Sequence, residues 1–164
     1  MPTRGFTTCL WFDGEAEAAV DFYLSVFKDG RRGRTTRYTQ ASPERAGSVM
    51  TVEFEMNGQR FVALNGGPQF RFTEAISFQI DCADQAEVDH YWAELTQDGG
   101  EEVACGWVKD RFGVSWQVIP TEAIDLVSDP DPARAARATA AMYRMKKLDV
   151  AAMRRAADTP KTLG

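Results

Sequence analysis

The sequence predicts an α+β fold in which one strand–helix–strand–strand–strand module occurs twice and a helical extension follows. Three observations lead to this prediction. Residues 7–67 and 75–120 repeat one order of predicted elements, an Asn-Gly pair joins two strand-like segments, and an Ala- and Arg-rich segment follows Pro120. Two such modules form a curved mixed sheet whose hollow holds a ligand. We therefore expect one domain over residues 1–128 and a helical extension over residues 129–164.

The first module begins with residues 7–13, a β-branched and aromatic run that ends in an Asp-Gly turn. A helix over residues 15–27 follows, because apolar residues recur there at three- and four-residue spacing. The next strand is expected over residues 34–40. Apolar and polar residues alternate over residues 49–56, and Asn57-Gly58 then predicts a tight hairpin into the returning strand.

The second module begins with a strand over residues 76–82, in which Ile76, Phe78 and Ile80 are expected to pack on helices. Asp84 predicts the N-cap of a helix over residues 85–96. The remaining strands are expected within residues 101–110 and 114–119. A doubly wound parallel sheet is the alternative, but the hairpin and the presence of only two helices among about eight strands favour a mixed sheet.

The extension starts after a linker that contains Pro130 and Pro132, and residues 133–157 have high helix propensity. Asp149 is placed to cap a second short helix. The apolar face that carries Met142 and its neighbours either packs on its own domain or forms a dimer contact, and the sequence leaves both open.

Charge and composition exclude several functional classes. The net charge of −5 makes nucleic acid an unlikely partner. No run approaches the about 20 apolar residues of a membrane span, and the N-terminus lacks the apolar core of a signal peptide, so we expect a cytoplasmic protein with no membrane partner. Cys9, Cys82 and Cys105 form no CxxC pair and are expected to be small buried hydrophobes.

Several motifs resemble those of one family. In order they are Leu10-Trp11-Phe12-Asp13-Gly14, Leu64-Asn65-Gly66-Gly67-Pro68, Glu74-Ala75-Ile76-Ser77-Phe78, Cys105-Gly106-Trp107, Asp110-Arg111-Phe112-Gly113-Val114-Ser115-Trp116-Gln117 and the tail over residues 142–149. Together they resemble the PhnB-like branch of the glyoxalase, bleomycin-resistance and extradiol-dioxygenase superfamily, also called vicinal oxygen chelate proteins. Members often carry the name 3-demethylubiquinone 3-methyltransferase, but the sequence has no glycine-rich nucleotide-binding turn of the kind that such chemistry suggests.

The resemblance implies paired βαβββ units that form a cup, and in the metalloenzymes of the superfamily four inward positions hold a divalent ion. Here those positions fall on Thr7 or Thr8, within residues 59–67, on Ala75 and on Gln117. None is a histidine or a carboxylate. The single histidine, His90, lies in a predicted helix and is expected to be either a surface residue or a hydrogen-bonded one. We therefore expect no metal ion and no other cofactor.

Strand alternation predicts which residues line a ligand pocket in the cup. The predicted set is Thr7, Trp11, Asn65, Ser77, Gln79, Trp107, Phe112, Ser115 and Gln117. The register of the first strand stays open: the turn at Asp13 places Thr7 and Trp11 inside, whereas counting from the helix reverses the assignment. Aromatic walls with a few amides and hydroxyls suit a small, partly apolar organic molecule.

Charged residues offer few candidates for catalysis. Asp110 is a weak candidate for a general base, and the alternative interpretation is a turn-former that binds its own backbone. Glu53 and Glu55 share one strand face, which is typical of a solvated surface unless that face lines the cup. The basic cluster at residues 31–34 is interpreted as a solvated loop, with anion binding as the alternative.

These observations favour a metal-free PhnB-like protein that binds a small organic molecule. The alternatives are a small-molecule lyase, isomerase or transferase, and a resistance protein that sequesters an antibiotic or toxic compound. A homodimer is expected by analogy with the family.

Overall fold

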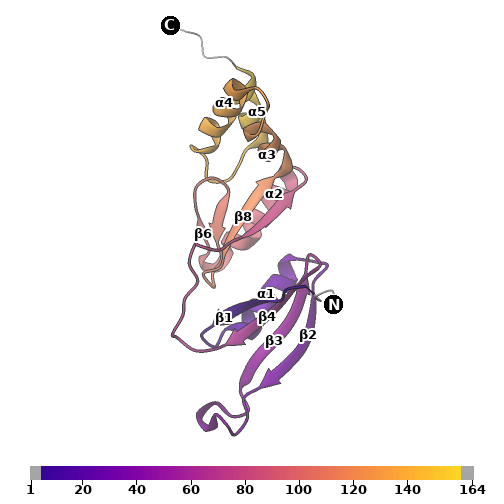
Figure 1. Cartoon of the computed structure of the whole chain (residues 1–164), viewed down its shortest axis with the longest axis vertical. Coiled ribbons are helices and arrows are strands. Elements are labelled where there is room, and N and C mark those ends of the chain that lie inside the picture. The colour runs from indigo at the N-terminus through magenta and orange to yellow at the C-terminus, as the bar shows by residue number, and fades with distance from the viewer. Residues whose placement is uncertain (1–4, 160–164) are drawn as a thin grey trace. The chain divides into compact units, whose positions relative to one another are not determined.

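The computed structural model of the chain describes residues 5–159, and its elements confirm the predicted α+β class (Figure 1). The strands are β1 (Thr8–Phe12), β2 (Arg31–Arg37), β3 (Val49–Met56), β4 (Gln59–Asn65), β5 (Phe78–Cys82), β6 (Glu101–Glu102), β7 (Trp107–Lys109) and β8 (Ser115–Pro120). The helices are α1 (Ala16–Val26), α2 (Gln85–Thr96), α3 (Thr121–Val127), α4 (Pro132–Met142) and α5 (Val150–Asp158), with short 3-10 turns at Pro43–Arg45 and Gln97–Gly99. The chain divides into two compact units, and the boundary lies between Phe72 and Thr73.

The first unit is a four-stranded sheet in the order β1-β4-β3-β2, with α1 packed against one face. β1 runs parallel to β4, and the other neighbours are antiparallel. The predicted hairpin between β3 and β4 is confirmed, because Asn57 and Gly58 both have positive φ values, 52° and 68°, as a two-residue turn of this kind requires. The apolar residues of the alternating strand, among them Val52 and Phe54, are buried.

The second unit repeats this topology, with a sheet in the order β5-β8-β7-β6. β5 runs parallel to β8, which in turn pairs antiparallel with β7. Asp84 caps α2 as predicted, because its side chain accepts a hydrogen bond of 3.0 Å from the backbone N–H of Glu87. The side chains of Val88 and Trp92 face the sheet and are buried. The predicted duplication is therefore present in the topology of both sheets.

Two predicted strands have wrong boundaries, and the first of them, β2, ends at Arg37 rather than at residue 40. β2 begins at Arg31 rather than at residue 34, because Arg31 pairs directly with Glu55 of β3. β5 begins at Phe78, and Ile76 is 63% exposed instead of packed on a helix. The partner strand β8 starts only at Ser115, so that no strand residue lies opposite Ile76.

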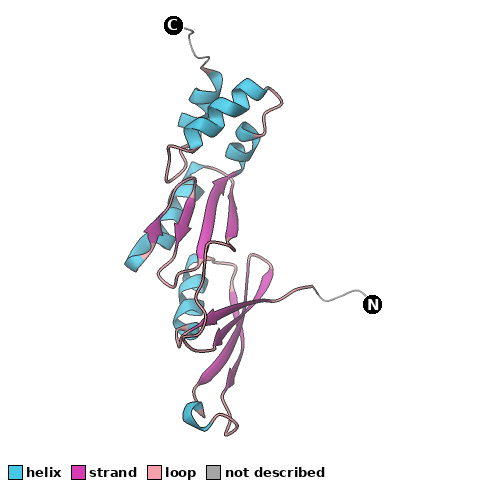
Figure 2. Cartoon of the chain, turned by 60° about the vertical axis from the view of Figure 1, so that its left-hand side comes forward, coloured by secondary structure: helices cyan, strands magenta, loops and turns pink. Residues whose placement is uncertain are grey.

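The extension after β8 contains three helices, which lie together in Figure 2. Their common core consists of Ala123, Leu126, Ala138, Leu148, Met153 and Ala157. The predicted cap at Asp149 is confirmed by a hydrogen bond of 2.8 Å from Ala152 N–H, whereas α3 was not predicted. The Gln85 side chain of α2 binds the carbonyl of Leu148 and the N–H of Val150, at 2.9 and 3.0 Å. The extension therefore packs on its own second unit, which is one of the two arrangements that the sequence left open.

The three cysteines differ in environment, so the prediction that all are buried is wrong. Cys82 is buried, Cys105 is half-buried and Cys9 is exposed, because Cys9 lies on the face of its sheet opposite α1.

His90 lies on the exposed side of α2, as predicted. Within residues 5–159 no helix has the length and apolar character needed to cross a membrane.

Candidate functional site

The face of the first sheet opposite α1, here called the first polar face, carries most of the polar side chains of its strands. Leu10 and Phe12 of β1 are buried against the helix side, so strand alternation places Cys9 and Trp11 on the opposite face. Of the two registers left open for the first strand, the one counted from Asp13 is therefore found. The same alternation places the following residues on this face: Thr51, Glu53, Glu55, Arg60, Val62 and Leu64.

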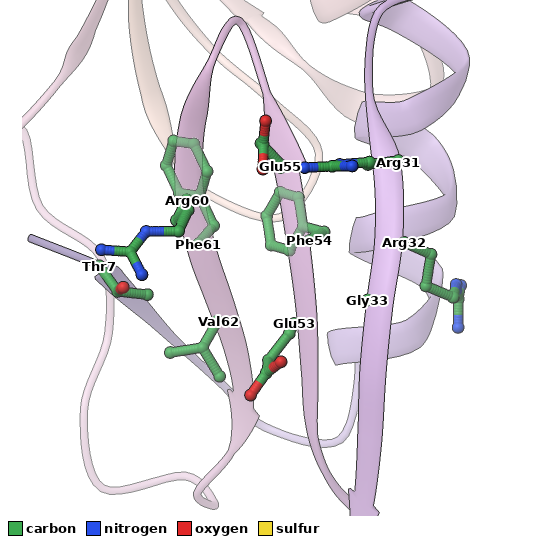
Figure 3. Close-up of a pocket in the computed structure, with 10 residues that line it drawn as sticks. All are labelled: Thr7, Arg31, Arg32, Gly33, Glu53, Phe54, Glu55, Arg60, Phe61 and Val62. Carbon is green, nitrogen blue, oxygen red and sulfur yellow. Dashed lines mark hydrogen bonds and ion pairs between the residues drawn. The ribbon is translucent and has the colours of Figure 1, made fainter. Parts of the chain in front are cut away.

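A pocket of about 500 Å³ lies at one end of the first polar face (Figure 3). It is lined by Thr7, Arg31, Arg32, Gly33, Glu53, Phe54, Glu55, Arg60, Phe61 and Val62. The strand register places Arg31, Glu55 and Arg60 side by side in one row across β2, β3 and β4. Charged side chains therefore dominate this end of the sheet.

Ion pairs organise the charges of the pocket. Arg31 binds Glu55 at 2.9 Å, and Arg34 binds Glu53 at 2.7 Å. The hydrogen bond from Arg31 to Glu55, together with the charge of that carboxylate, raises the pKa of Arg31. Arg32 points away from the face and pairs with Asp21 of α1 (Figure 3). The basic cluster that the sequence placed in a solvated loop is thus part of a strand, and two of its members bind glutamates of the first polar face.

Three predicted pocket residues lie in the first unit, and they have different surroundings. Thr7 lines the pocket itself. Trp11 lies further along the same face, where its indole N–H donates to the carbonyl of Gly67 at 2.8 Å and its ring meets Phe70 edge-on. Asn65 accepts a hydrogen bond from the N–H of Ala16 at 2.9 Å, so its amide holds the first turn of α1. Asn65 also lines a second, smaller pocket of about 320 Å³ beside Tyr38 and Arg45.

The second polar face, which is the face of the second sheet opposite α2, brings several predicted residues together. The amide N–H of Gln117 donates to the hydroxyl of Ser77 at 2.9 Å. Gln117 also lies between Gln79 of β5 and Trp107 of β7 in the strand register. Amides, a hydroxyl and an indole ring are therefore neighbours on this face.

Two further side chains add charge at the edge of the second polar face. Lys109, which pairs with Ser115 in the strand register, forms an ion pair with Glu74. The hydrogen bond between them lowers the pKa of Glu74 and raises the pKa of Lys109.

The predicted pocket residue Ser115 is buried. The predicted residue Phe112 is half-buried in the turn between β7 and β8, under the guanidinium of Arg111.

Asp110 is buried and binds its own turn. One carboxylate oxygen accepts from the N–H groups of Phe112 and Val114, at 2.9 and 3.1 Å. The other accepts from the indole N–H of Trp116 at 2.8 Å. Trp116 packs on the α2 side of its sheet and is 2% exposed. These are the hydrogen bonds that the turn-forming interpretation of Asp110 requires.

A model of the family described as 3-demethylubiquinone-9 3-methyltransferase matches residues 4–119. The chain belongs to this family. The match covers both sheets except for Pro120, the last residue of β8, and it ends before α3, so the helical extension lies outside the matched residues.

Several solved structures are similar to this chain. A PhnB protein from Bacillus cereus, which carries the name 3-demethylubiquinone-9 3-methyltransferase, is 33% identical, covers 70% of this chain and 97% of its own, and gives a TM-score of 0.62. Protein PA1353 from Pseudomonas aeruginosa is 20% identical over 70% of this chain and 95% of its own, with a TM-score of 0.56. The fosfomycin resistance protein FosX from Listeria monocytogenes, solved with Mn(II) and sulfate, is 20% identical over 71% of this chain and 90% of its own, with a TM-score of 0.46. No functionally curated protein matches the chain.

The chain is thus a PhnB-like protein, as the motifs predicted. The metal site of the superfamily can be tested against its residues. In the part of the chain that the structure describes, no three His, Cys, Asp or Glu side chains lie close enough together to hold a metal ion. The positions expected for ligands carry a hydroxyl at Thr7 and an amide at Gln117, neither of which is a strong ligand for a divalent transition metal. The residues of this PhnB-like chain therefore do not fit the superfamily metal.

The charged pocket is the feature that the sequence analysis missed. The signals were present in the alternation that puts Glu53 and Glu55 on one face and in the basic run that begins at Arg31. What joins them to Arg60 is the pairing of three strands, and this register cannot be read from local sequence alone.

Proposed function

We propose that this PhnB-like protein binds a small, partly apolar organic molecule on its polar sheet faces without using a metal ion. The observation that carries the proposal is the composition of these faces. Amide, hydroxyl and indole groups are neighbours on the second polar face, in the row of Gln79, Gln117 and Trp107 and in the hydrogen bond from Gln117 to Ser77. Guanidinium groups lie on the first polar face. Such groups orient a small ligand by hydrogen bonds and ring contacts.

The printed name of the family favours a second candidate, a small-molecule transferase that uses a methyl donor. The residues give this candidate little support. β1 enters α1 through Asp13-Gly14-Glu15, which has a single glycine, and β2 then pairs antiparallel with β3. A glycine-rich strand-turn-helix that feeds a parallel sheet is the usual cradle for a nucleotide-like cofactor. Calorimetry with S-adenosylmethionine tests this candidate directly, and micromolar binding would favour it.

The main experiment combines metal analysis with a ligand screen on the purified full-length protein. We expect less than a tenth of an equivalent of divalent metal, and an unfolding temperature that rises with a subset of small organic compounds. A stoichiometric divalent ion that survives dialysis would refute the metal-free proposal. Mass spectrometry of the compounds after incubation then separates the alternatives: an antibiotic recovered unchanged supports sequestration, whereas a converted compound supports an enzyme.

A homodimer is part of the proposal. Large apolar side chains are exposed in a single copy, with Phe6 98% and Phe70 65% exposed. Exposed aromatic groups of this size are typical of surfaces that a partner covers. Light scattering coupled to size-exclusion chromatography measures the mass in solution, and a particle of the single-chain mass, 18.2 kDa, would refute the dimer.

A further inference from the structure

The helical extension has a charge opposite to that of the rest of the chain. Residues 129–164 contain eight basic and four acidic side chains, which give a net charge of +4. Residues 1–128 contain 11 basic and 20 acidic side chains, which give a net charge of −9. Because the family model ends at residue 119, the basic charge of the extension is a feature that family membership does not explain.

Two basic side chains are available on the loop between α4 and α5. Other basic residues of the extension already bind a carboxylate or a carbonyl, namely Arg134, Arg137, Lys147 and Arg154. Arg144 and Lys146 are exposed, and their side chains form no hydrogen bond or ion pair within residues 5–159. Tyr143 beside them is 68% exposed. We call residues 143–147 the basic loop.

The backbone of the basic loop is held in place. The N–H of Cys105 donates to the carbonyl of Met145 at 2.9 Å, and the N–H of Gly106 donates to the carbonyl of Lys146 at 2.8 Å. The side chain of Met145 packs on the core of the extension. A fixed loop loses little conformational entropy when it docks, and tyrosine and arginine are enriched among the residues that dominate interface energies. The basic loop therefore has the rigidity and the composition of a docking surface.

The smaller pocket of the first unit, of about 320 Å³ and here called the acidic pocket, has the complementary charge. Asp13 and Glu17 line it, and both are exposed. Neither carboxylate forms a hydrogen bond or ion pair within the described residues. The guanidinium of Arg45 lies 4.1 Å from the centre of the Tyr38 ring and donates to the hydroxyl of Tyr38 at 2.9 Å, instead of to a carboxylate. Two carboxylates of this pocket are therefore available to a partner.

We propose that the basic loop of one copy docks on the acidic pocket of a second copy, in a symmetric dimer with two identical contacts. This inference rests on the proposed homodimer and names the surfaces that join the two copies. Charge complementarity favours a second copy as the partner, because Arg144 and Lys146 then meet carboxylates that lack a partner in a single copy. In a twofold dimer each copy gives its loop and receives the other loop, so the contact is made twice.

Two double charge reversals test the proposal in the full-length protein. The loop variant carries Arg144→Glu and Lys146→Glu, and the pocket variant carries Asp13→Lys and Glu17→Lys. Each variant alone places like charges opposite each other in both contacts, so we expect its dimer dissociation constant to rise by about tenfold or more. Analytical ultracentrifugation measures this constant. The wild-type dimer should also weaken in about 1 M salt, where the screening length falls to about 3 Å.

An equimolar mixture of the two variants shows whether the contact joins different copies. In a mixed dimer the reversed loop of one variant faces the reversed pocket of the other, and the unchanged loop faces the unchanged pocket. We therefore expect mixing to restore a dimer of near wild-type affinity, and native mass spectrometry identifies it by its mass. Restoration also shows that both variants are folded.

The matched controls are Arg155→Glu and Asp29→Lys, which are compared with the single variants Arg144→Glu and Glu17→Lys. Arg155 is exposed in the last turn of α5, at the end of that helix away from the basic loop. Asp29 is exposed beyond the C-terminal end of α1, whereas the acidic pocket lies at its N-terminal end. Each control should change the dissociation constant by less than about twofold.

The outcomes separate this inference from the proposals on which it rests. A wild-type protein of single-chain mass would refute both the homodimer and the docking contact. A dimer that persists in both double variants would refute the docking contact alone. Dissociation of both variants without restoration on mixing would show that the loop and the pocket do not meet across copies. Equal effects in the controls would show a general influence of charge and would also overturn the inference. None of these results bears on the binding of a small molecule, which the ligand screen decides.

Discussion

Replacing Asp110 by alanine should destabilise the second unit strongly, because its carboxylate satisfies three N–H groups. Two of its hydrogen bonds, from Val114 N–H and from the Trp116 indole, are buried, and the third, from Phe112 N–H, is partly buried. In Asp110→Ala these donors stay in the protein without their acceptor. The turn that joins β7 to β8 would also lose the group that closes it.

The magnitude follows from the cost of unsatisfied donors. Each buried donor that loses its partner costs about 1 to 3 kcal/mol, and the partly buried donor costs less because water can reach it. The costs of losing neighbouring hydrogen bonds do not simply add. We therefore expect Asp110→Ala to lower the free energy of unfolding by about 3 to 5 kcal/mol. Asp110→Asn keeps one acceptor oxygen and should cost about half as much.

Equilibrium urea denaturation, followed by tryptophan fluorescence, measures this change. Three of the four tryptophans, Trp92, Trp107 and Trp116, lie in the second unit and report on its unfolding. The control is Asp125→Ala, an exposed aspartate of α3, for which we expect a change within about 0.5 kcal/mol. If Asp110→Ala lies within about 1 kcal/mol of the wild type, the structural role argued for this carboxylate is wrong.

Three other predictions concern the packing of Trp11 on Gly66, the attachment of the helical extension to α2, and the titration of the Cys82 thiol. In Gly66→Ala the new Cβ would lie 2.2 Å from the Trp11 ring, so we expect a loss of about 1 to 3 kcal/mol and altered Trp11 fluorescence. Gln85→Ala removes both hydrogen bonds to the extension, which should cost about 1 to 2 kcal/mol and speed hydrogen exchange in α5. Burial raises the pKa of Cys82 from 9.0 to about 12. As the pH rises, the thiol therefore loses its proton in the unfolded chain at a lower pH than in the folded protein. Stability should therefore fall between pH 9 and 12 by about 1.4 kcal/mol per pH unit, and Cys82→Ala should lack this contribution.

Each of these predictions has a result that would contradict it. An unchanged melting temperature and emission spectrum in Gly66→Ala would show that Trp11 is not held against this glycine. Gln97→Ala, at the exposed end of α2, is the control for Gln85 and should leave exchange in α5 unchanged. For Cys82 the measured quantity is the difference in unfolding free energy between variant and wild type at several pH values, with Cys105→Ala as the control. A difference that stays constant from pH 8 to pH 11 would refute the linkage.

The fold was predictable where local rules decide the structure. The alternation over β3, the Asn57-Gly58 turn and the cap at Asp84 each act over a few residues, and all three predictions are confirmed. The wrong strand boundaries lie in segments whose ends are set by pairing with a strand that is distant in sequence. β2 starts at Arg31 because β3 offers a pairing strand there, and Ile76 is exposed because β8 begins too late to pair with it.

The candidate site was less predictable for the same physical reason. The pocket brings together Arg31, Glu55 and Arg60 from three strands and Thr7 from the segment just before β1. A register shift in β2 also separates the pairing of Arg32 from that of Thr35. Since one residue of slip moves a side chain to the other face of a sheet, local patterns could not place these groups together. In the second unit, alternation alone was enough to put Gln117 and Ser77 on one face, where they form a hydrogen bond.

The duplicated topology also separates the residues that the fold requires from those that the proposed ligand would contact. In both sheets the positions that face the helix are apolar, as with Phe54 in the first and Ile80 in the second, because burial there drives folding. Residues on the opposite faces do not have to be apolar, and the two faces differ in composition. Arg31 and Arg60 lie on the first, and Gln79 and Gln117 lie on the second. We therefore expect substitutions on these faces to change the binding of the proposed ligand at little cost in stability. It follows that the chemistry of this PhnB-like chain is encoded in side chains that the packing of its two sheets does not constrain.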